Sequence, residues 1–179
     1  EFGLSYSSVG LLATVTAIAG GIILPFAGYL TDKIGCKKLI IYGLVVLLIG
    51  QVLFAVAPNF VILLLARIFA GIGVGILIVA PYTIVVHWFS SSNAVGLGMG
   101  TMLSSDGIGT LVATYGFSIF FITLGWRMST LVSCVVIIIM LILCAIYLKE
   151  SPTFKVNTSL RMDKPTLGRL LTNRNAISG

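Results

Sequence analysis

The sequence predicts an all-α membrane protein, a polytopic helix bundle with five transmembrane helices. Hydrophobic residues make up 58% of its 179 residues and charged residues only 9%, whereas a soluble domain averages roughly 25% charged residues. The mean hydropathy is +1.14. Five mostly apolar runs each provide about the 20 residues that a helix needs to cross a bilayer. Continuous apolar runs such as 135–143 do not fit the alternating pattern of a membrane β-barrel.

These five runs define a transmembrane bundle over residues 1–148. The helices are expected at 9–30, 39–57, 60–80, 94–124 and 128–148. The fourth run is longer than a bilayer requires, so its helix must tilt, kink or extend beyond the membrane. Serines within 5–8 and the amide of Asn59 offer N-cap oxygens to the first and third helices. Pro25 and Pro81 each remove a backbone donor, and we expect kinks there.

Basic residues fall mainly on one side of the membrane if the five helices alternate in direction. Nine of the eleven lie there, namely Lys33, Lys37, Lys38 and the six within 149–179. The positive-inside rule makes that side cytoplasmic. We therefore expect a cell-membrane protein whose chain begins outside, with a cytoplasmic basic linker at 149–179. The net charge of +6 would set this topology and contact anionic lipid headgroups, and we expect no nucleic acid as a partner.

Residues with metal-binding or nucleophilic chemistry are sparse. The three cysteines show no CxxC or Cys/His spacing, and His87 is the single histidine. Cys134 and Cys144 fall in an apolar run, so Cys36 is the cysteine that we expect to be accessible. The sequence therefore predicts no metal site, no cofactor and no catalytic triad, which argues against an enzyme.

A short charged segment bracketed by glycines joins the first two runs. Its notable residues are Gly28, Asp32, Lys33, Gly35 and Lys37. The glycines allow a tight turn, and the charges lie where two helices leave the lipid. The segment resembles the loop between the second and third helices of the major facilitator superfamily, whose form is Gly-x-x-x-Asp-Arg-x-Gly-Arg-Arg/Lys. Cys36 departs from that form at a position where arginine is usual.

The resemblance implies an architecture and a mechanism. The five helices would be helices two to six of twelve in an alternating-access solute carrier, and the polar tail would be its central linker. An odd number of helices with an external start also predicts a chain that has lost its beginning. The substrate path would lie against a carboxy-terminal half that is absent from this chain. The charged segment would act as a conformational gate, because Asp32 can contact positive helix N-termini of that half.

Arg67 and Asp106 are the charges that we expect inside the membrane. Arg67 lies ~10 Å below the outer edge and Asp106 ~12 Å below it, so the two are expected to face one interior and to pair. The apolar surroundings favour a protonated carboxyl and a nearby cation favours a charged one, which would couple a proton to movement. Met102 and Thr110 share the helical stripe of Asp106 and complete the expected substrate and proton path. A structural ion pair without a transport role remains the alternative.

Glycines at helical spacing predict close contacts between helices. The predicted packing glycines are Gly71, Gly73, Gly75, Gly96 and Gly100. The pattern Arg67-x-x-x-Gly71-x-Gly73 resembles the fourth-helix motif of the same superfamily, whose arginine lines the central path.

Three short segments resemble monocarboxylate and oxalate–formate carriers. They are Trp88-Phe89, Gly107-Ile108-Gly109-Thr110-Leu111 and Gly125-Trp126-Arg127. We therefore expect a secondary transporter of a small solute, proton-coupled as a symporter, whose substrate is an organic anion bound by the fixed cation Arg67. A sugar or drug carrier of the same superfamily is one alternative. A membrane assembly subunit that transports nothing is another, and a membrane enzyme is the third.

Overall fold

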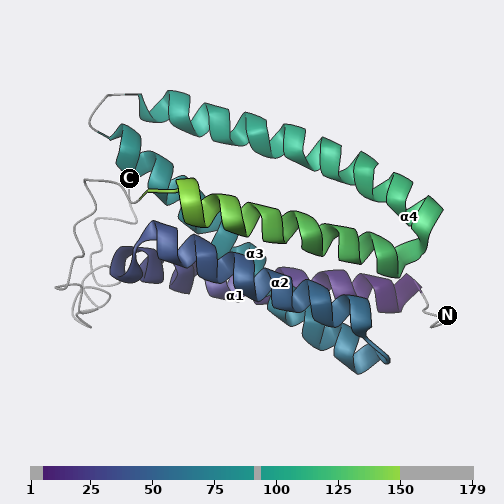
Figure 1. Cartoon of the computed structure of the whole chain (residues 1–179). Helices are drawn as coiled ribbons and strands as arrows, with labels where there is room; N and C mark the ends of the chain where they lie inside the picture. Colours follow the sequence, from purple (N-terminus) through teal and green to yellow (C-terminus); the bar gives the residue numbers. More distant parts are fainter. Residues whose placement is uncertain (1–5, 91–93, 150–179) are drawn as a thin grey trace, which may run out of the picture.

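The structure, a computed structural model, describes residues 6–90 and 94–149. The described chain forms four helical elements (Figure 1). They are α1 (Tyr6–Ile34), α2 (Cys36–Val56), α3 (Phe60–Phe89) and α4 (Val95–Tyr147). Beyond Lys149, the predicted linker lies outside the described residues.

Gly125 divides α4 into two arms that run in opposite directions (Figure 1). Its φ of 79° and ψ of 170° are not helical, and they fall in a region that essentially only glycine adopts. The first arm (Val95–Thr123) has 29 residues and the second arm (Gly125–Tyr147) has 23. With α1, α2 and α3, the two arms give five helices long and apolar enough to cross a membrane. The predicted all-α bundle of five membrane helices is confirmed.

The first arm stands apart from the rest of the bundle. In Figure 1, α1, α2, α3 and the second arm pack side by side, while the first arm lies away from them along most of its length. No residue of its most apolar window is buried, against 33% of that window in α2 and 39% in α3. One side of the packed helices is therefore left uncovered beneath the first arm.

Glycines let the backbone of α3 touch both of its neighbours. A Cβ on Gly71 would collide with the carbonyl of Thr16 in α1, and a Cβ on Gly75 would lie 2.7 Å from the carbonyl of Gly20. On the opposite face, a Cβ on Gly73 would lie 2.8 Å from the α2 backbone. Such distances leave no room for any side chain, as small residues at membrane-helix crossings commonly show.

Apolar side chains fill the space between α1, α2 and α3 near their Gly35 end. The buried members of this core are Ala27, Leu39, Ile40, Leu44, Ile76 and Ala80. Ile137 and Leu141 of the second arm pack against it from outside. The second arm is thus held on the core that α1, α2 and α3 share.

The residues at the helix ends cap α3 and connect α1 to α2. The Oδ1 atom of Asn59 accepts a hydrogen bond from the backbone N–H of Ile62 at 3.1 Å, which confirms the predicted N-cap. Gly35, with a φ of 97°, is the only residue between α1 and α2. The charged segment is therefore the last turn of α1 and the first turn of α2. Cys36 begins α2 facing inward and is 1% exposed, so the expectation that it is accessible is wrong.

The helices run further than the apolar runs indicate. α1 passes Pro25 without a break, and α3 passes Pro81 and continues to Phe89 instead of ending near residue 80. Hydrogen bonding along a helix continues through polar residues as long as their backbone geometry permits. Hydropathy marks the lipid-facing part of a helix and not its full length.

Candidate functional site

A cavity of about 970 Å³ lies between the first arm and the packed helices. Small residues of α1 leave this space open, and they are Ala13, Ala17, Gly20 and Gly21. The rest of the wall comes from larger residues of α1 and from α2, α3 and both arms, and it is mostly apolar. The hydroxyls of Thr16 and Thr130 line it too, but each donates to a carbonyl of its own helix. Arg67 is the charged side chain among the described residues that line the cavity.

An aromatic stack holds the side chain of Arg67. Its guanidinium carbon lies 4.1 Å from the centroid of the Phe54 ring, which is close enough for a cation–π contact. Phe54 in turn meets Trp126 in a T-shaped arrangement, with centroids 5.9 Å apart and ring planes at 79°. The three side chains come from α3, α2 and the second arm, so the stack forms only when these helices are packed together.

No carboxylate of the described residues lines the cavity beside Arg67. The acids there are Asp32 and Asp106. Asp32 is exposed in the last turn of α1, near the opposite end of the bundle. A half-buried cation in a cavity of low polarity attracts an anion more strongly than it would in water. The arrangement therefore favours the binding of a negatively charged group.

Asp106 does not join this site. It is exposed on the first arm and is absent from the lining of the cavity. It lies about three helical turns before Phe117, or ~16 Å along the axis at 1.5 Å per residue. Phe117, not Asp106, lines the cavity with Arg67. The expected pairing of Arg67 and Asp106 is therefore absent from the described structure, because Asp106 lies about three turns along the first arm from the residues that line the cavity.

Asp106 nevertheless shares one face of the first arm with the cavity-lining residues. At about 100° per residue, Thr110, Asp106 and Met102 point within about 60° of the direction of Phe117. Phe117 and Phe121 line the cavity, so the same face continues away from the cavity along the first arm. The predicted stripe of Met102, Asp106 and Thr110 thus continues the face that carries Phe117 and Phe121, but these three residues do not line the cavity.

The aromatic residues of the cavity are what sequence reasoning missed. Phe54, Phe117, Phe121 and Trp126 all line it, yet the three phenylalanines lie in runs where apolar residues are the rule, and Trp126 stands between two such runs. Phe117 and Phe121 sit one turn apart with ring centroids 6.3 Å apart. A signal was present in the one-turn spacing of this pair and in the place of Trp126 directly after Gly125, where a helix reverses.

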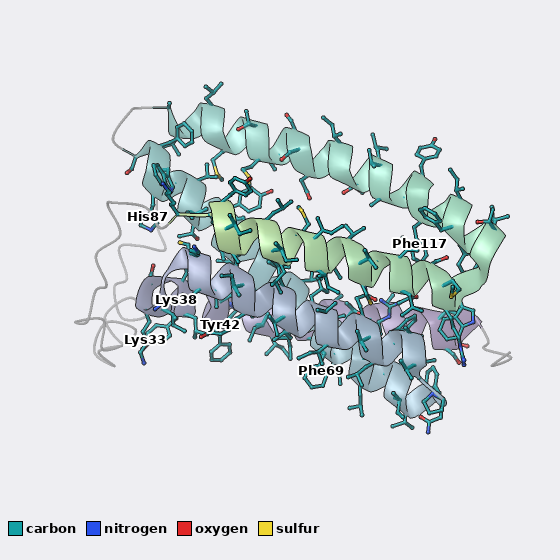
Figure 2. All side chains as sticks on the ribbon, in the orientation of Figure 1. Lys33, Lys38, Tyr42, Phe69, His87 and Phe117 are labelled. Atoms are coloured by element: carbon teal, nitrogen blue, oxygen red, sulfur yellow. The ribbon has the colours of Figure 1, made fainter. Side chains whose placement is uncertain are left out.

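The charged segment makes its contact at the other end of the bundle. Figure 2 shows Lys33, Lys38 and His87 at that end, remote from Phe117. The Nζ atom of Lys37 donates a hydrogen bond to the carbonyl oxygen of Ala145 at 3.0 Å, near the end of the second arm. Asp32 and Lys33 are exposed, and a Cβ on Gly28 would meet open space. The segment therefore presents an acid outward while its second lysine binds within the bundle.

The contact between the first arm and α3 does not use the predicted glycines. A Cβ on Gly96 or Gly100 would meet nothing within 4 Å, whereas one on Gly98 would lie 2.8 Å from Val85 and 3.0 Å from Phe89. The predicted contact face at Gly96 and Gly100 is thus corrected to Gly98. The i, i+4 spacing marks a face, but the glycine between them is the one that faces α3.

Comparison with known proteins shows the family of the chain. Residues 1–177 match the family described as Major Facilitator Superfamily. Over 75 residues, or 42% of the chain, it is 40% identical to Quinolone resistance protein NorA of Staphylococcus aureus. It is 27% identical over 174 residues, or 95% of the chain, to Monosaccharide-sensing protein 3 of Arabidopsis thaliana.

The aligned segments cover 19% of the first relative and 24% of the second, so the chain spans about a fifth to a quarter of the length of these curated relatives. The family match extends over nearly the whole chain and agrees with the five membrane-length helices. This chain is a multi-pass membrane protein that belongs to the Major Facilitator Superfamily, a family of transporters and not of enzymes.

Proposed function

We propose that this chain is part of a secondary active transporter that moves a small organic anion by alternating access, coupled to protons. The observation that supports it best is Arg67, a half-buried cation held by an aromatic ring and lining an apolar cavity. A charge at this depth is costly unless it serves a partner or a ligand. An anion that enters the cavity would meet a cation that no described carboxylate neutralises.

The face of the first arm supplies the rest of the proposed path. Thr110, Asp106 and Met102 continue this face from the aromatic pair toward the opposite end of the first arm. Asp106 is the acid on that path, and a carboxylate is a group that can accept a proton. Asp106 would therefore carry the coupled proton, while Arg67 binds the substrate.

The proposed carrier needs further parts and a defined orientation. A carboxy-terminal half would complete the substrate path opposite the first arm, which has an exposed apolar surface in the described structure. The positive-inside rule supports a cell-membrane protein with the start of this chain outside and its end in the cytoplasm. The segment from Gly28 to Lys37 would form the cytoplasmic gate, with Asp32 exposed for a contact with that half.

Other members of the superfamily suggest a second substrate class. A drug carrier is favoured by the four aromatic residues of the cavity and by the likeness to a quinolone resistance protein. A sugar carrier has weaker support, because the cavity offers few hydrogen-bonding groups besides Arg67 and two threonine hydroxyls. The remaining alternative is an assembly subunit that binds partner helices through its exposed first arm and transports nothing.

Uptake into proteoliposomes tests the proposal. The probes are benzoate and pyruvate as anions, glucose as a sugar and norfloxacin as a quinolone, each with and without an inward proton gradient. We expect gradient-driven uptake of an anion. Arg67→Gln should reduce it about 30-fold or more, since a buried charge-assisted contact is worth roughly 2 kcal/mol or more. Arg67→Lys should retain part of it.

The coupling role of Asp106 has its own readout in the same vesicles. Asp106→Asn should keep exchange of the anion across the membrane while abolishing the stimulation by the proton gradient. Uptake of glucose or norfloxacin that does not depend on Arg67 would replace the anion proposal with one of the other carriers. Absence of uptake for every probe would favour the assembly subunit.

A further inference from the structure

The geometry points to Phe54 as a positioning residue that holds Arg67 in the cavity and leaves its positive charge available for an anion. This inference rests on the proposed function and adds the residue that holds the charged side chain of Arg67 in place. Phe54 comes from α2, the guanidinium from α3, and 4.1 Å separates the guanidinium carbon from the ring centroid. Nothing in the apolar composition of α2 marks this phenylalanine among its neighbours.

An aromatic ring holds a guanidinium group differently from a carboxylate. A carboxylate would hold the guanidinium by neutralising it and would compete with an incoming anion. The face of an aromatic ring attracts a cation through its quadrupole and has no net charge. Phe54 therefore stabilises Arg67 in a place of low polarity while the cavity keeps a net positive charge.

Trp126 fixes the orientation of the Phe54 ring. Its T-shaped contact with Phe54, at 5.9 Å between centroids, restricts the tilt of the Phe54 ring, since edge-to-face is a favoured arrangement for two rings. Trp126 also lines the cavity and follows Gly125, where α4 reverses. The turn between the two arms thus positions Trp126, which orients the Phe54 ring against the guanidinium of Arg67.

The shape of the cavity then defines the anion. The charged group would meet Arg67, and the apolar body would lie among side chains such as Phe117 and Phe121. The site fits a monoanion with an apolar or aromatic body better than a small polyanion, because one cation is present among the described lining residues.

Quenching of Trp126 fluorescence tests the inference without knowledge of the substrate. The chain has two tryptophans, so Trp88→Phe leaves Trp126 as the sole reporter within the cavity. Arg127, whose guanidinium carbon lies 5.0 Å from the Trp126 ring centroid, would also attract an anionic quencher. The background therefore carries Arg127→Gln as well. Iodide, caesium and acrylamide serve as anionic, cationic and neutral quenchers of the full chain in nanodiscs.

The measured quantity is the ratio of the iodide to the acrylamide quenching constant. In this background we expect the ratio to fall about threefold or more with Arg67→Gln. That variant removes a nearby positive charge, which attracts iodide strongly in a cavity of low polarity. Phe54→Leu should lower it to a similar extent, and Phe54→Tyr should preserve it. Acrylamide and caesium quenching should change little in each variant.

A second variant separates positioning from packing. Incorporation of 3,4,5-trifluorophenylalanine at position 54 keeps the ring but weakens the negative charge of its face. The iodide ratio should then fall between the values for phenylalanine and leucine. A ratio equal to that of the background would overturn the positioning role. If Arg67→Gln lowers the ratio but Phe54→Leu does not, only this inference fails; if Arg67→Gln has no effect, the proposed anion site fails too.

Discussion

Lys37 at the start of α2 binds the far end of α4, with its Nζ atom 3.0 Å from the carbonyl oxygen of Ala145. The two residues are 108 positions apart in the chain. The carbonyls of a last helical turn have no partner within the helix, and a cation there is favoured by the helix dipole. This hydrogen bond thus joins the charged segment to the end of the second arm.

Lys37→Met should therefore loosen the end of the second arm. We expect a loss of about 1 kcal/mol of local stability and about fivefold faster hydrogen exchange at the amide of Leu148, which donates to the Cys144 carbonyl at 3.1 Å. Lys38→Met removes an exposed lysine one position later and should leave that exchange rate unchanged. Equal exchange rates of the Leu148 amide in the two variants would mean that the hydrogen bond between Lys37 and Ala145 does not stabilise the end of the second arm.

Gly125→Ala should destabilise the protein through the backbone alone. At a φ of 79° and ψ of 170° an L side chain is strained, at a cost of about 1–3 kcal/mol, although a Cβ there would meet nothing within 4 Å. Gly116→Ala places the same methyl group in a helical part of the first arm that is equally open, and it should stabilise by about 0.5–1 kcal/mol. Thermal unfolding in detergent micelles measures both.

Gly73→Ala should destabilise the crossing of α3 with α2. Its Cβ would lie 2.8 Å from the Leu47 backbone nitrogen, so the helices would have to separate, at a cost of about 1–3 kcal/mol. Gly96→Ala, in open space, should be neutral or stabilising by up to about 1 kcal/mol. Chemical denaturation of the two variants gives the comparison, and a larger loss for Gly96 would mean that the first arm packs on a neighbour through that face.

Most of the fold could be predicted from the sequence because lipid imposes a simple rule. A backbone in hydrocarbon must satisfy its own hydrogen bonds, so apolar runs of sufficient length become helices. The N-cap at Asn59 is equally local, and the structure confirms it. The division of α4 at Gly125 agrees with a sequence pattern in which the fourth and fifth runs nearly touch.

The site was less predictable, because it depends on the rotation and depth of each helix. Arg67 could be found from its charge in an apolar run and from the glycines that follow it, but the ring that holds it belongs to α2, where the adjacent residues are also apolar. The depth of Asp106 was estimated from the bilayer edge. The first arm is 29 residues long, however, and Asp106 lies on it about three turns before Phe117. Periodicity places residues on a face, and only packing decides what that face meets.

The separation of Arg67 from Asp106 predicts that their effects on stability add. In a double-mutant cycle of Arg67→Gln and Asp106→Asn, the coupling in the free energy of unfolding should stay under about 0.5 kcal/mol, since no hydrogen bond or ion pair joins them in the described structure. The matched cycle of Arg67→Gln with Phe54→Leu should give about 0.5–2 kcal/mol, because those side chains are in contact. Chemical denaturation in micelles supplies the four free energies of each cycle. A coupling of about 1 kcal/mol or more between Arg67 and Asp106 would mean that the first arm also occupies a position in which the two charges meet, and the aromatic stack would then hold Arg67 in only one of two states.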